Sequence, residues 1–306
     1  MKIMVFDVGG TEIKYSVMDE QMHRTNSGAV PTPQDTQAQF LDTVYRLYAP
    51  YKDEVTGIAM ALPGFVDNRT GYVSNGGALL YNTATPVGQL LAEKCGCPVI
   101  LENDGKAAAM AELANGALKD CCNAAVFIIG TGVGGGIIAN GQLVRGVHFT
   151  AGEYSFVNTN AEAWDAPDQN MACQCSTSNL LKWYRARKAL PEDAPLDGRS
   201  FFAAANAGEP EALEVLQRFC HAVAVQIFNL TVLLDVEKVA IGGGISKQPL
   251  LLESLRSAYD GLYASRAGQA YMEGLPRCQI VPCAFSSEAN QVGVAAAYFE
   301  AMQKKR

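Results

Sequence analysis

The chain has 306 residues, 49% of them hydrophobic and 18% charged, so it can bury a sizeable core in two domains or lobes. A net charge of −7, with no basic run outside Lys304-Lys305-Arg306, argues against a nucleic-acid partner. No stretch approaches the roughly 18 apolar residues that span a bilayer, and no secretory signal pattern follows Met1. Nine cysteines without framework spacing fit reduced thiols. We therefore expect a cytoplasmic protein without membrane contact.

Strand signals dominate the first hundred residues. The pattern predicts strands over residues 3–6, 13–18, about 26–30, 55–62 and 98–102, and helices over 34–48 and 86–95. A polar hairpin is expected through residues 68–73. An alanine-rich helix begins at about Lys106, directly after Asn103-Asp104. Asn103 and Asp104 therefore lie at a strand-to-helix junction, which is a frequent place for catalytic groups.

The second half of the chain repeats this plan. Strands are predicted over residues 124–129, 135–139, 142–144, 236–241 and 279–282, with helices over 210–234, after 244 and from 288. Residues 158–200 are expected to be irregular. Because a strand, glycine turn and strand followed by helix–strand units occur twice, the sequence predicts two related α/β lobes with a cleft between them.

Two glycine-rich segments follow apolar strands. Asp7-Val8-Gly9-Gly10-Thr11 lets backbone N–H groups approach an anion, because glycine has no Cβ. Asp7 would hold a metal ion or its water, Thr11 adds a hydroxyl and Lys14 a charge. A second segment, Gly130-Thr131-Gly132-Val133-Gly134-Gly135-Gly136, suggests a second phosphate contact of one nucleotide. A glycine turn without a ligand remains the alternative for each segment.

The second segment also matches the dinucleotide fingerprint. Gly130, Gly132 and Gly135 fit G-x-G-x-x-G, and Glu153 lies about where a ribose-binding acid would be. That fingerprint must open a helix, whereas the chain continues here in a hairpin pattern. NAD binding is therefore disfavoured, and no Walker A sequence is present.

Two acids are candidates for sugar chemistry. A hydroxyl that attacks a γ-phosphate needs an acceptor for its proton. Asp104 can be that acceptor, although a lone Asp at this place more often caps its helix. Glu153 follows a glycine in a polar loop and can accept hydrogen bonds from sugar hydroxyls, or can be an ordinary surface acid.

Six motifs in this order resemble the ROK family of sugar kinases, within the actin-like/hexokinase superfamily, from residue 3 to about 299. They are Asp7-Val-Gly-Gly-Thr-Glu-Ile-Lys14, Leu62-Pro-Gly64, Glu102-Asn-Asp104, Gly130-Thr-Gly-Val-Gly-Gly-Gly136, Ala151-Gly-Glu153 and Ile241-Gly-Gly-Gly-Ile245. The resemblance implies an α/β fold of two actin-like (ribonuclease H-like) lobes with an interlobe cleft. We expect residues 1–104 and 289–306 to form the smaller lobe and 105–288 the larger one. The resemblance to the ROK family also implies a homodimer.

The resemblance implies a role for each motif. Asp104 would be the general base, and Asp7 would hold Mg²⁺ directly or through water. ATP would bind to Asp7, Gly9, Gly10, Thr11, Lys14, Gly130, Thr131, Gly132 and Gly134, with the adenosine near Gly243 and Gly244. The sugar would bind to Gly64, Asn75, Gly76, Gly77, Asn103, Asp104 and Glu153.

Two departures from the family pattern bear on the substrate. Phe156 stands where the family has a histidine, and Cys173-Gln174-Cys175 lacks the rest of the family's zinc segment. Two thiolates do not close a tetrahedral site, so we predict no zinc. Family members that lack the zinc segment and have an aromatic residue at the position of Phe156 resemble β-glucoside kinases and N-acetylmannosamine kinases.

The prediction is therefore ATP- and Mg²⁺-dependent phosphorylation of a hexose or β-glucoside hydroxyl, namely the 6-hydroxyl of a glucose unit. N-acetylmannosamine kinase-type activity is one alternative. A sugar-responsive binding protein without turnover is the other, since two sugar ligands are substituted.

Overall fold

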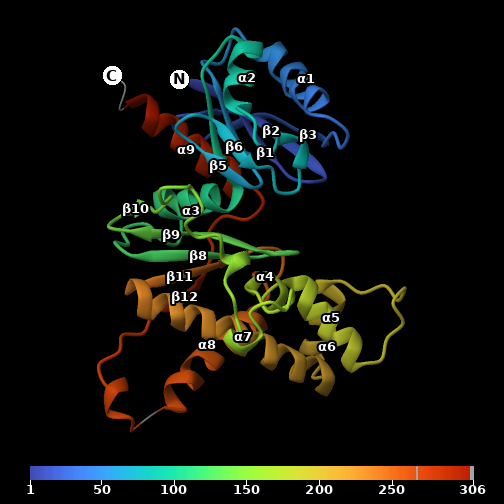
Figure 1. Cartoon of the computed structure of the whole chain (residues 1–306), viewed down its shortest axis with the longest axis vertical. Helices are drawn as coiled ribbons and strands as arrows, with labels where there is room; N and C mark the ends of the chain where they lie inside the picture. Colours follow the sequence, from blue (N-terminus) through green and yellow to red (C-terminus); the bar gives the residue numbers. More distant parts are fainter. Residues whose placement is uncertain (267, 304–306) are drawn as a thin grey trace. The chain divides into compact units, whose positions relative to one another are not determined.

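The computed structural model describes residues 1–266 and 268–303, which form two compact units (Figure 1). The first unit holds Met1–Gly116, Leu143–Ala151 and the segment that begins at Ser287. The second holds Ala117–Gln142 and Gly152–Ser286. The basic tail noted above, residues 304–306, lies outside the described residues.

The first unit is built on a five-stranded sheet in the order β3-β2-β1-β4-β7. The antiparallel pairs β1–β2 and β2–β3 are followed by β4 and β7, which run parallel to β1. All residues of β1 after Lys2 are buried, which indicates that both faces of the sheet are covered. The strands are β1 (Lys2–Val8), β2 (Glu12–Asp19), β3 (Arg24–Pro31), β4 (Ile58–Leu62) and β7 (Val99–Asn103), with a small hairpin of β5 (Phe65–Asp67) and β6 (Tyr72–Asn75).

Helices cover both faces of this sheet. Helices α1 (Gln37–Tyr48) and α2 (Val87–Cys95) share a core with alternate strand residues such as Phe6. Helices α3 (Asp104–Asn115) and α9 (Ala289–Gln303) pack against each other, and α9 contacts β1, β4 and β7. A Cβ on Gly293 would lie 1.7 Å from the Ala107 carbonyl oxygen, so only glycine permits the close approach of α9 to α3.

The second unit repeats the same topology. Its sheet has the order β10-β9-β8-β11-β12, with β8–β9 antiparallel and β11 parallel to both β8 and β12. The strands are β8 (Ala124–Ile129), β9 (Val133–Ala139), β10 (Gln142–Leu143), β11 (Lys238–Gly242) and β12 (Gln279–Pro282). This repetition confirms the predicted α/β class with two related lobes.

The described part of the second unit also holds five α-helices, and the longest packs along α8 and α5. They are α4 (Met171–Gln174), α5 (Thr177–Arg187), α6 (Gly198–Asn206), α7 (Pro210–Leu234) and α8 (Pro249–Ala264). Among the described residues α7 alone is long and apolar enough to cross a membrane, with a mean hydropathy of 1.2 over 18 residues. The expectation that no stretch approaches this limit is therefore wrong for α7. Half of that window is buried within the fold, as in a helix of a protein core.

The prediction of an irregular stretch over residues 158–200 is wrong for α4, for α5 and for the start of α6. Ser176 caps α5, since its hydroxyl accepts a hydrogen bond from the Asn179 N–H. Leu180 and Tyr184 are buried one turn apart. The remaining residues of α5 are largely polar, so this narrow apolar face gave only a weak helical pattern in the sequence.

Candidate functional site

The turn at the end of β1 is closed by its own backbone and by the segment after β3. The Gly9 N–H donates to the Glu12 carbonyl at 2.9 Å. The Thr32 hydroxyl donates to the Gly9 carbonyl at 2.8 Å, and the Gln34 side chain donates to the Gly10 carbonyl at 2.7 Å. Carbonyl oxygens of the turn are thus engaged from the β3 side. This is the conformation expected of a tight glycine turn, and Thr11 lies in it, exposed.

Asp7 is a buried carboxylate beside that turn. It pairs with Lys14 across the β1–β2 ladder and is 9% exposed. The Asn290 side-chain amide donates to its Oδ1 at 2.9 Å. Burial raises the pKa of Asp7, while the hydrogen bond from Asn290 and the charge of Lys14 oppose that shift. Sequence reasoning missed Asn290, because no local pattern connects two residues 283 positions apart.

Asn103 and Asp104 lie at the junction of β7 and α3, as predicted. Asn103 is the helix N-cap, since its side-chain oxygen accepts from the Lys106 N–H at 3.0 Å. Asp104 is therefore the first helical residue and not the cap. Its Oδ1 accepts from the Gly105 N–H at 2.7 Å and from the Asn103 amide at 3.1 Å.

The structure brings the other predicted sugar residues of the first unit to this junction. The Asn103 amide also donates to the Gly64 carbonyl at 2.9 Å. Gly64 has φ +92°, and a Cβ there would lie 2.0 Å from the Asn75 carbonyl oxygen and 2.7 Å from the Gly77 nitrogen. A side chain at residue 64 is thus excluded, and the segment from Asn75 to Gly77 packs directly on Gly64.

The segment from Asn75 to Gly77 also links the β7–α3 junction to the glycine turn at Gly9 and Gly10. A Cβ on Gly10 would lie 3.1 Å from the Cβ of Ala78, the residue after Gly77. Within the first unit, the predicted phosphate turn and the predicted sugar residues therefore form one continuous cluster.

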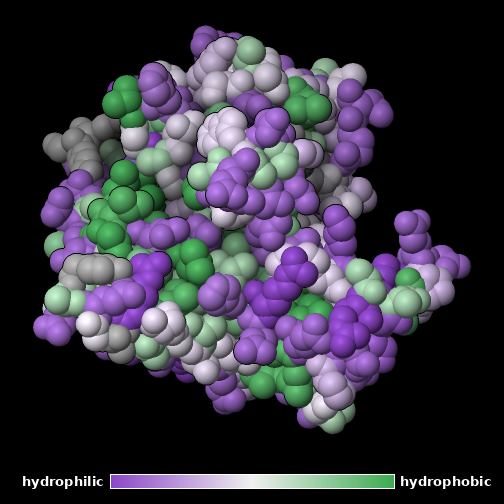
Figure 2. All heavy atoms as spheres, turned by 60° about the horizontal axis from the view of Figure 1, so that its bottom comes forward, coloured by the Kyte–Doolittle hydropathy of each residue, from purple (hydrophilic) through white to green (hydrophobic). Residues whose placement is uncertain are grey.

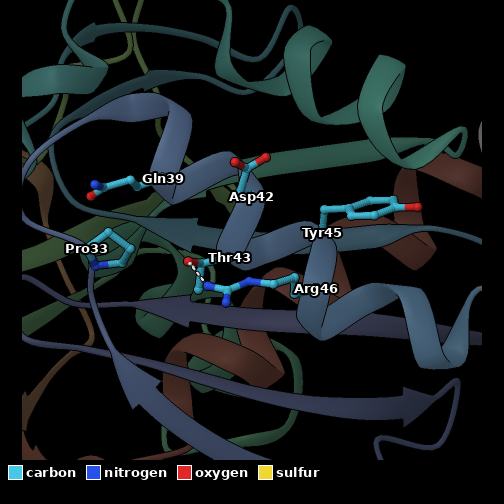
Figure 3. A pocket seen from close by; sticks show the side chains of 6 residues that line it. All are labelled: Pro33, Gln39, Asp42, Thr43, Tyr45 and Arg46. Atoms are coloured by element: carbon cyan, nitrogen blue, oxygen red, sulfur yellow. Dashed lines mark hydrogen bonds between the residues drawn. The ribbon is translucent and has the colours of Figure 1, made fainter.

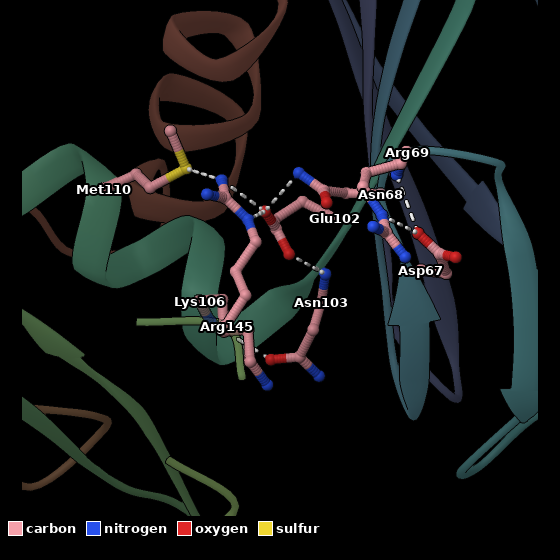
Figure 4. A network of polar contacts seen from close by, with 8 residues as sticks. All are labelled: Asp67, Asn68, Arg69, Glu102, Asn103, Lys106, Met110 and Arg145. Carbon is pink, nitrogen blue, oxygen red and sulfur yellow. Dashed lines mark hydrogen bonds and ion pairs between the residues drawn. The ribbon is translucent and has the colours of Figure 1, made fainter. Parts of the chain in front are cut away.

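An ion pair between the buried Glu102 and the partly exposed Arg145 lies beside Asn103 (Figure 4). Glu102 is 1% exposed, and its Oε2 accepts from Nε and Nη2 of Arg145, both at 2.8 Å. Burial raises the pKa of Glu102, while Arg145, the Asn103 N–H and Lys106 oppose that shift. Neither Glu102 nor Arg145 was given a role from the sequence, although Glu102 belongs to the Glu-Asn-Asp motif.

The second glycine segment divides between a turn and a strand. The Gly130 N–H donates to the Gly132 carbonyl at 3.0 Å, and Thr131 is exposed at the tip of this turn. Gly134 to Gly136 lie in β9, paired with β8. The chain thus continues as a hairpin and not as a helix, which agrees with the sequence argument against a dinucleotide fingerprint.

Gly243 and Gly244 lie beside that turn in the second unit. Gly243 has φ +98°, and a Cβ there would lie 2.0 Å from the carbonyl oxygen of Ile129, the last residue of β8. Nothing lies within 4 Å of a Cβ on Gly244. The N-terminus of α5 is also here, since the Thr177 N–H donates to the Gly130 carbonyl at 2.8 Å.

Glu153 begins a short 3-10 turn, Tyr154–Phe156, in the second unit. Tyr154 anchors the turn: its hydroxyl donates to the Gly136 carbonyl at 3.2 Å and its ring stacks on Phe127. Phe156 is 70% exposed, and Trp164 farther along the chain is 76% exposed. The face in Figure 2 carries many hydrophilic residues, with groups of hydrophobic residues between them.

The cysteines of the predicted zinc-less segment are free thiols. Cys175 is buried, and Cys173 is partly exposed, with its Sγ 3.7 Å from the Pro167 carbonyl oxygen. Within residues 1–266 and 268–303, no group of three or more His, Cys, Asp or Glu residues could hold a metal ion. The absence of zinc stays a prediction.

A hollow on the outer face of α1 is a weaker candidate (Figure 3). Its charged groups are already paired. Asp42 lies 2.6 Å from the Lys94 ammonium, and Arg46 donates to the Thr43 hydroxyl at 3.0 Å. None of the predicted site residues lines it.

Comparison with known proteins gives consistent matches. The ROK family model matches residues 3–303. A beta-glucoside kinase from Listeria innocua is 30% identical over 258 residues, which cover 84% of this chain and 87% of that protein. An N-acetyl-D-glucosamine kinase from Vibrio atlanticus is 31% identical over 277 residues, covering 82% and 86%. A solved ROK family protein from Streptococcus pneumoniae in complex with sucrose has a TM-score of 0.86 at 27% identity, covering 99% of this chain and 100% of that one.

Proposed function

This chain belongs to the ROK family and is a sugar kinase, and we propose that it transfers the γ-phosphoryl group of ATP to the 6-hydroxyl of a glucose unit in a hexose or β-glucoside. The observation that carries this proposal is the cluster of Asp104, Asn103 and Gly64 with the turn at Asp7, all within the first unit.

Asp104 is the general base. Its carboxylate is held at one oxygen by the Gly105 N–H and the Asn103 amide, which fixes its orientation at the start of α3. It takes the proton of the sugar hydroxyl while that oxygen bonds to the γ-phosphorus and the bond to the ADP oxygen breaks. The proposed sugar ligands are Asn103, Gly64, the segment from Asn75 to Gly77, and Glu153.

The two glycine turns bind the phosphates of ATP. Gly9, Gly10 and Thr11, with Lys14, form one phosphate contact, and the other is formed by Gly130, Thr131, Gly132 and Gly134. Gly243 and Gly244 bind the adenosine, since Gly244 has open space where a side chain would be. The Asp7 carboxylate offers the hard oxygen ligands that Mg²⁺ prefers, and the bound ion would neutralise charge on the phosphoryl oxygens.

Phe156 supports a glucoside as substrate. It belongs to the 3-10 turn that Glu153 begins, and the residue is 70% exposed. An exposed aromatic ring offers an apolar face to the second ring of a β-glucoside, which a monosaccharide lacks. Relatives named as kinases of beta-glucosides and of N-acetyl-D-glucosamine support a substrate that contains a glucose-type ring. The protein is further proposed to act as a homodimer, which light scattering of the purified protein would test.

The direct test is ADP release with a panel of glucose, cellobiose, N-acetylmannosamine, N-acetylglucosamine, mannose and fructose. We expect kcat/KM to be highest for cellobiose or glucose, and phosphorus NMR to place the phosphate on the 6-oxygen. A preference for N-acetylmannosamine would overturn the glucose assignment. No sugar-dependent ADP release with any member would overturn the proposal.

A further inference from the structure

The Glu102 carboxylate has partners on both of its oxygens (Figure 4). Its Oε2 accepts two nitrogens of Arg145 at 2.8 Å and the Asn68 amide at 3.5 Å. Its Oε1 accepts the backbone N–H of Asn103 at 3.1 Å. Such a carboxylate is fixed in position, because any rotation breaks a charge-assisted hydrogen bond.

The other half of this pair comes from a distant part of the chain. Arg145 lies in the segment Leu143–Ala151, which belongs to the first unit although the residues on both sides belong to the second. The next two residues of the chain are Gly152 and the proposed sugar ligand Glu153. The segment closes on itself, since the Ala151 N–H donates to the Arg145 carbonyl at 3.2 Å.

A second contact fastens this segment. The Arg69 guanidinium lies 4.8 Å from the centre of the Phe149 ring, and Phe149 is 9% exposed. Phe149 has φ +60°, a left-handed conformation that a bulky residue adopts only where its surroundings hold it. The segment is thus docked on the first unit at both Arg145 and Phe149.

We infer that Glu102 and Arg145 are a positioning pair for the sugar: they hold the Asn103–Asp104 junction in register and tie to it the segment that leads into Glu153. This inference rests on the proposed roles of Asn103, Asp104 and Glu153. Neither member of the pair touches the reacting atoms. Each acts through a neighbour, Glu102 through the Asn103 N–H and Arg145 through the segment that it anchors.

The Glu102–Arg145 pair supplies a specific hydrogen-bond geometry as well as opposite charges. Arg145 places Nε and Nη2 on one oxygen, and Nη2 also lies 3.4 Å from the Met110 sulfur. A lysine has one nitrogen and cannot reproduce this two-nitrogen contact. The Arg145→Lys variant therefore keeps the charge and loses the geometry.

The test compares R145K and the double variant E102L/R145M with the wild-type protein. The double variant removes both charges together, so that the buried Glu102 carboxylate is not left without its partner. The sugar and ATP are varied separately, and melting is followed for each variant. The matched control is R187M/E214L, which removes an exposed pair with the same 2.8 Å contact between Arg Nε and Glu Oε2.

We expect E102L/R145M to raise the KM for sugar at least about 5-fold and to lower kcat about 10-fold, because small displacements of reacting groups are costly. The KM for ATP should stay within about twofold, and R145K should lie between wild type and the double variant. The control variant R187M/E214L should leave kcat, the KM for sugar and the KM for ATP unchanged.

A structural role alone would lower kcat in proportion to the folded fraction and leave both KM values unchanged, and that outcome overturns the inference. An unchanged KM for sugar in a folded double variant does so as well. If E102L/R145M shows no cooperative melting transition, the KM for sugar of R145K is used instead, and an unchanged value in folded R145K overturns the inference. D104N, measured alongside, separates the two proposals: its normal turnover would remove the proposed base, whereas an inactive D104N with unaffected pair variants overturns only the positioning role.

Discussion

The side-chain amide of Asn290, at the start of α9, donates a 2.9 Å hydrogen bond to the carboxylate of Asp7, at the end of β1. The two residues are 283 positions apart. The contact places the first and last elements of the chain at one side of the proposed phosphate turn, and it orients the carboxylate proposed to hold Mg²⁺.

Replacing Asn290 by alanine should weaken the binding of MgATP. A hydrogen bond to a charged group contributes about 1.5–3 kcal/mol, so the KM for MgATP should rise about 10-fold or more. The KM for sugar should change little, since Asn103 and Gly64 are untouched. The matched control is Gln291→Ala, because the Gln291 side-chain oxygen accepts from Ser16 and Arg24 and its loss leaves the Asn290–Asp7 hydrogen bond in place. Equal ATP kinetics in the two variants would contradict the role given to Asn290.

Asp104→Asn should lower kcat by at least about 10²-fold, the usual contribution of a general base. Asparagine has the same shape, and its Oδ1 can still accept from the Gly105 N–H. Binding of ATP and the melting temperature should therefore stay near the wild-type values. Steady-state kinetics with a nucleotide-binding titration checks this, and near-normal turnover would remove Asp104 from the mechanism.

Much of the fold could be predicted because the two glycine turns and their flanking strands are local patterns. The strand pair around Gly9 and Gly10 and the β7–α3 junction follow from alternation and from the residues at the turn. The contacts that could not be predicted from the sequence are non-local. Asn290 on Asp7, and Arg145 on Glu102, are contacts between segments that no periodicity connects.

The narrow face of α5 was missed for a different reason. Its helical signal rests on Leu180 and Tyr184 and on the cap at Ser176, amid polar residues. Residues 158–200 look irregular in the sequence because they are polar and lack a clear apolar pattern. Local propensity without a wide apolar face is weak evidence for a helix.

Gly135→Ala should destabilise the second unit. Gly135 has φ +148°, and a Cβ there would lie 1.9 Å from the Val126 carbonyl oxygen and 2.8 Å from the Tyr154 ring. Backbone strain and displacement of β8 should cost about 2–4 kcal/mol in the free energy of unfolding. Gly134→Ala, one residue earlier in the same strand, meets nothing within 4 Å and is the control. Urea unfolding compares them, and equal midpoints would refute the steric argument.

Phe156→Ala should change substrate preference more than overall activity. Loss of an aromatic contact of about 0.5–1.5 kcal/mol lowers kcat/KM for cellobiose relative to glucose about 2- to 10-fold. Trp164→Ala serves as the control, because Trp164 is equally exposed but lies outside the turn that carries Glu153. A constant cellobiose-to-glucose ratio in F156A would remove Phe156 from substrate selection.

The purified protein should contain less than about 0.1 equivalent of zinc, because a structural site needs four ligands and only two thiols lie in this segment. Burial raises the pKa of the Cys175 thiol to about 12. Elemental analysis measures the zinc content directly. Cys173→Ser and treatment with a chelator should each leave the melting temperature unchanged. One equivalent of zinc that is lost together with stability in C173S would show that the segment does bind the metal.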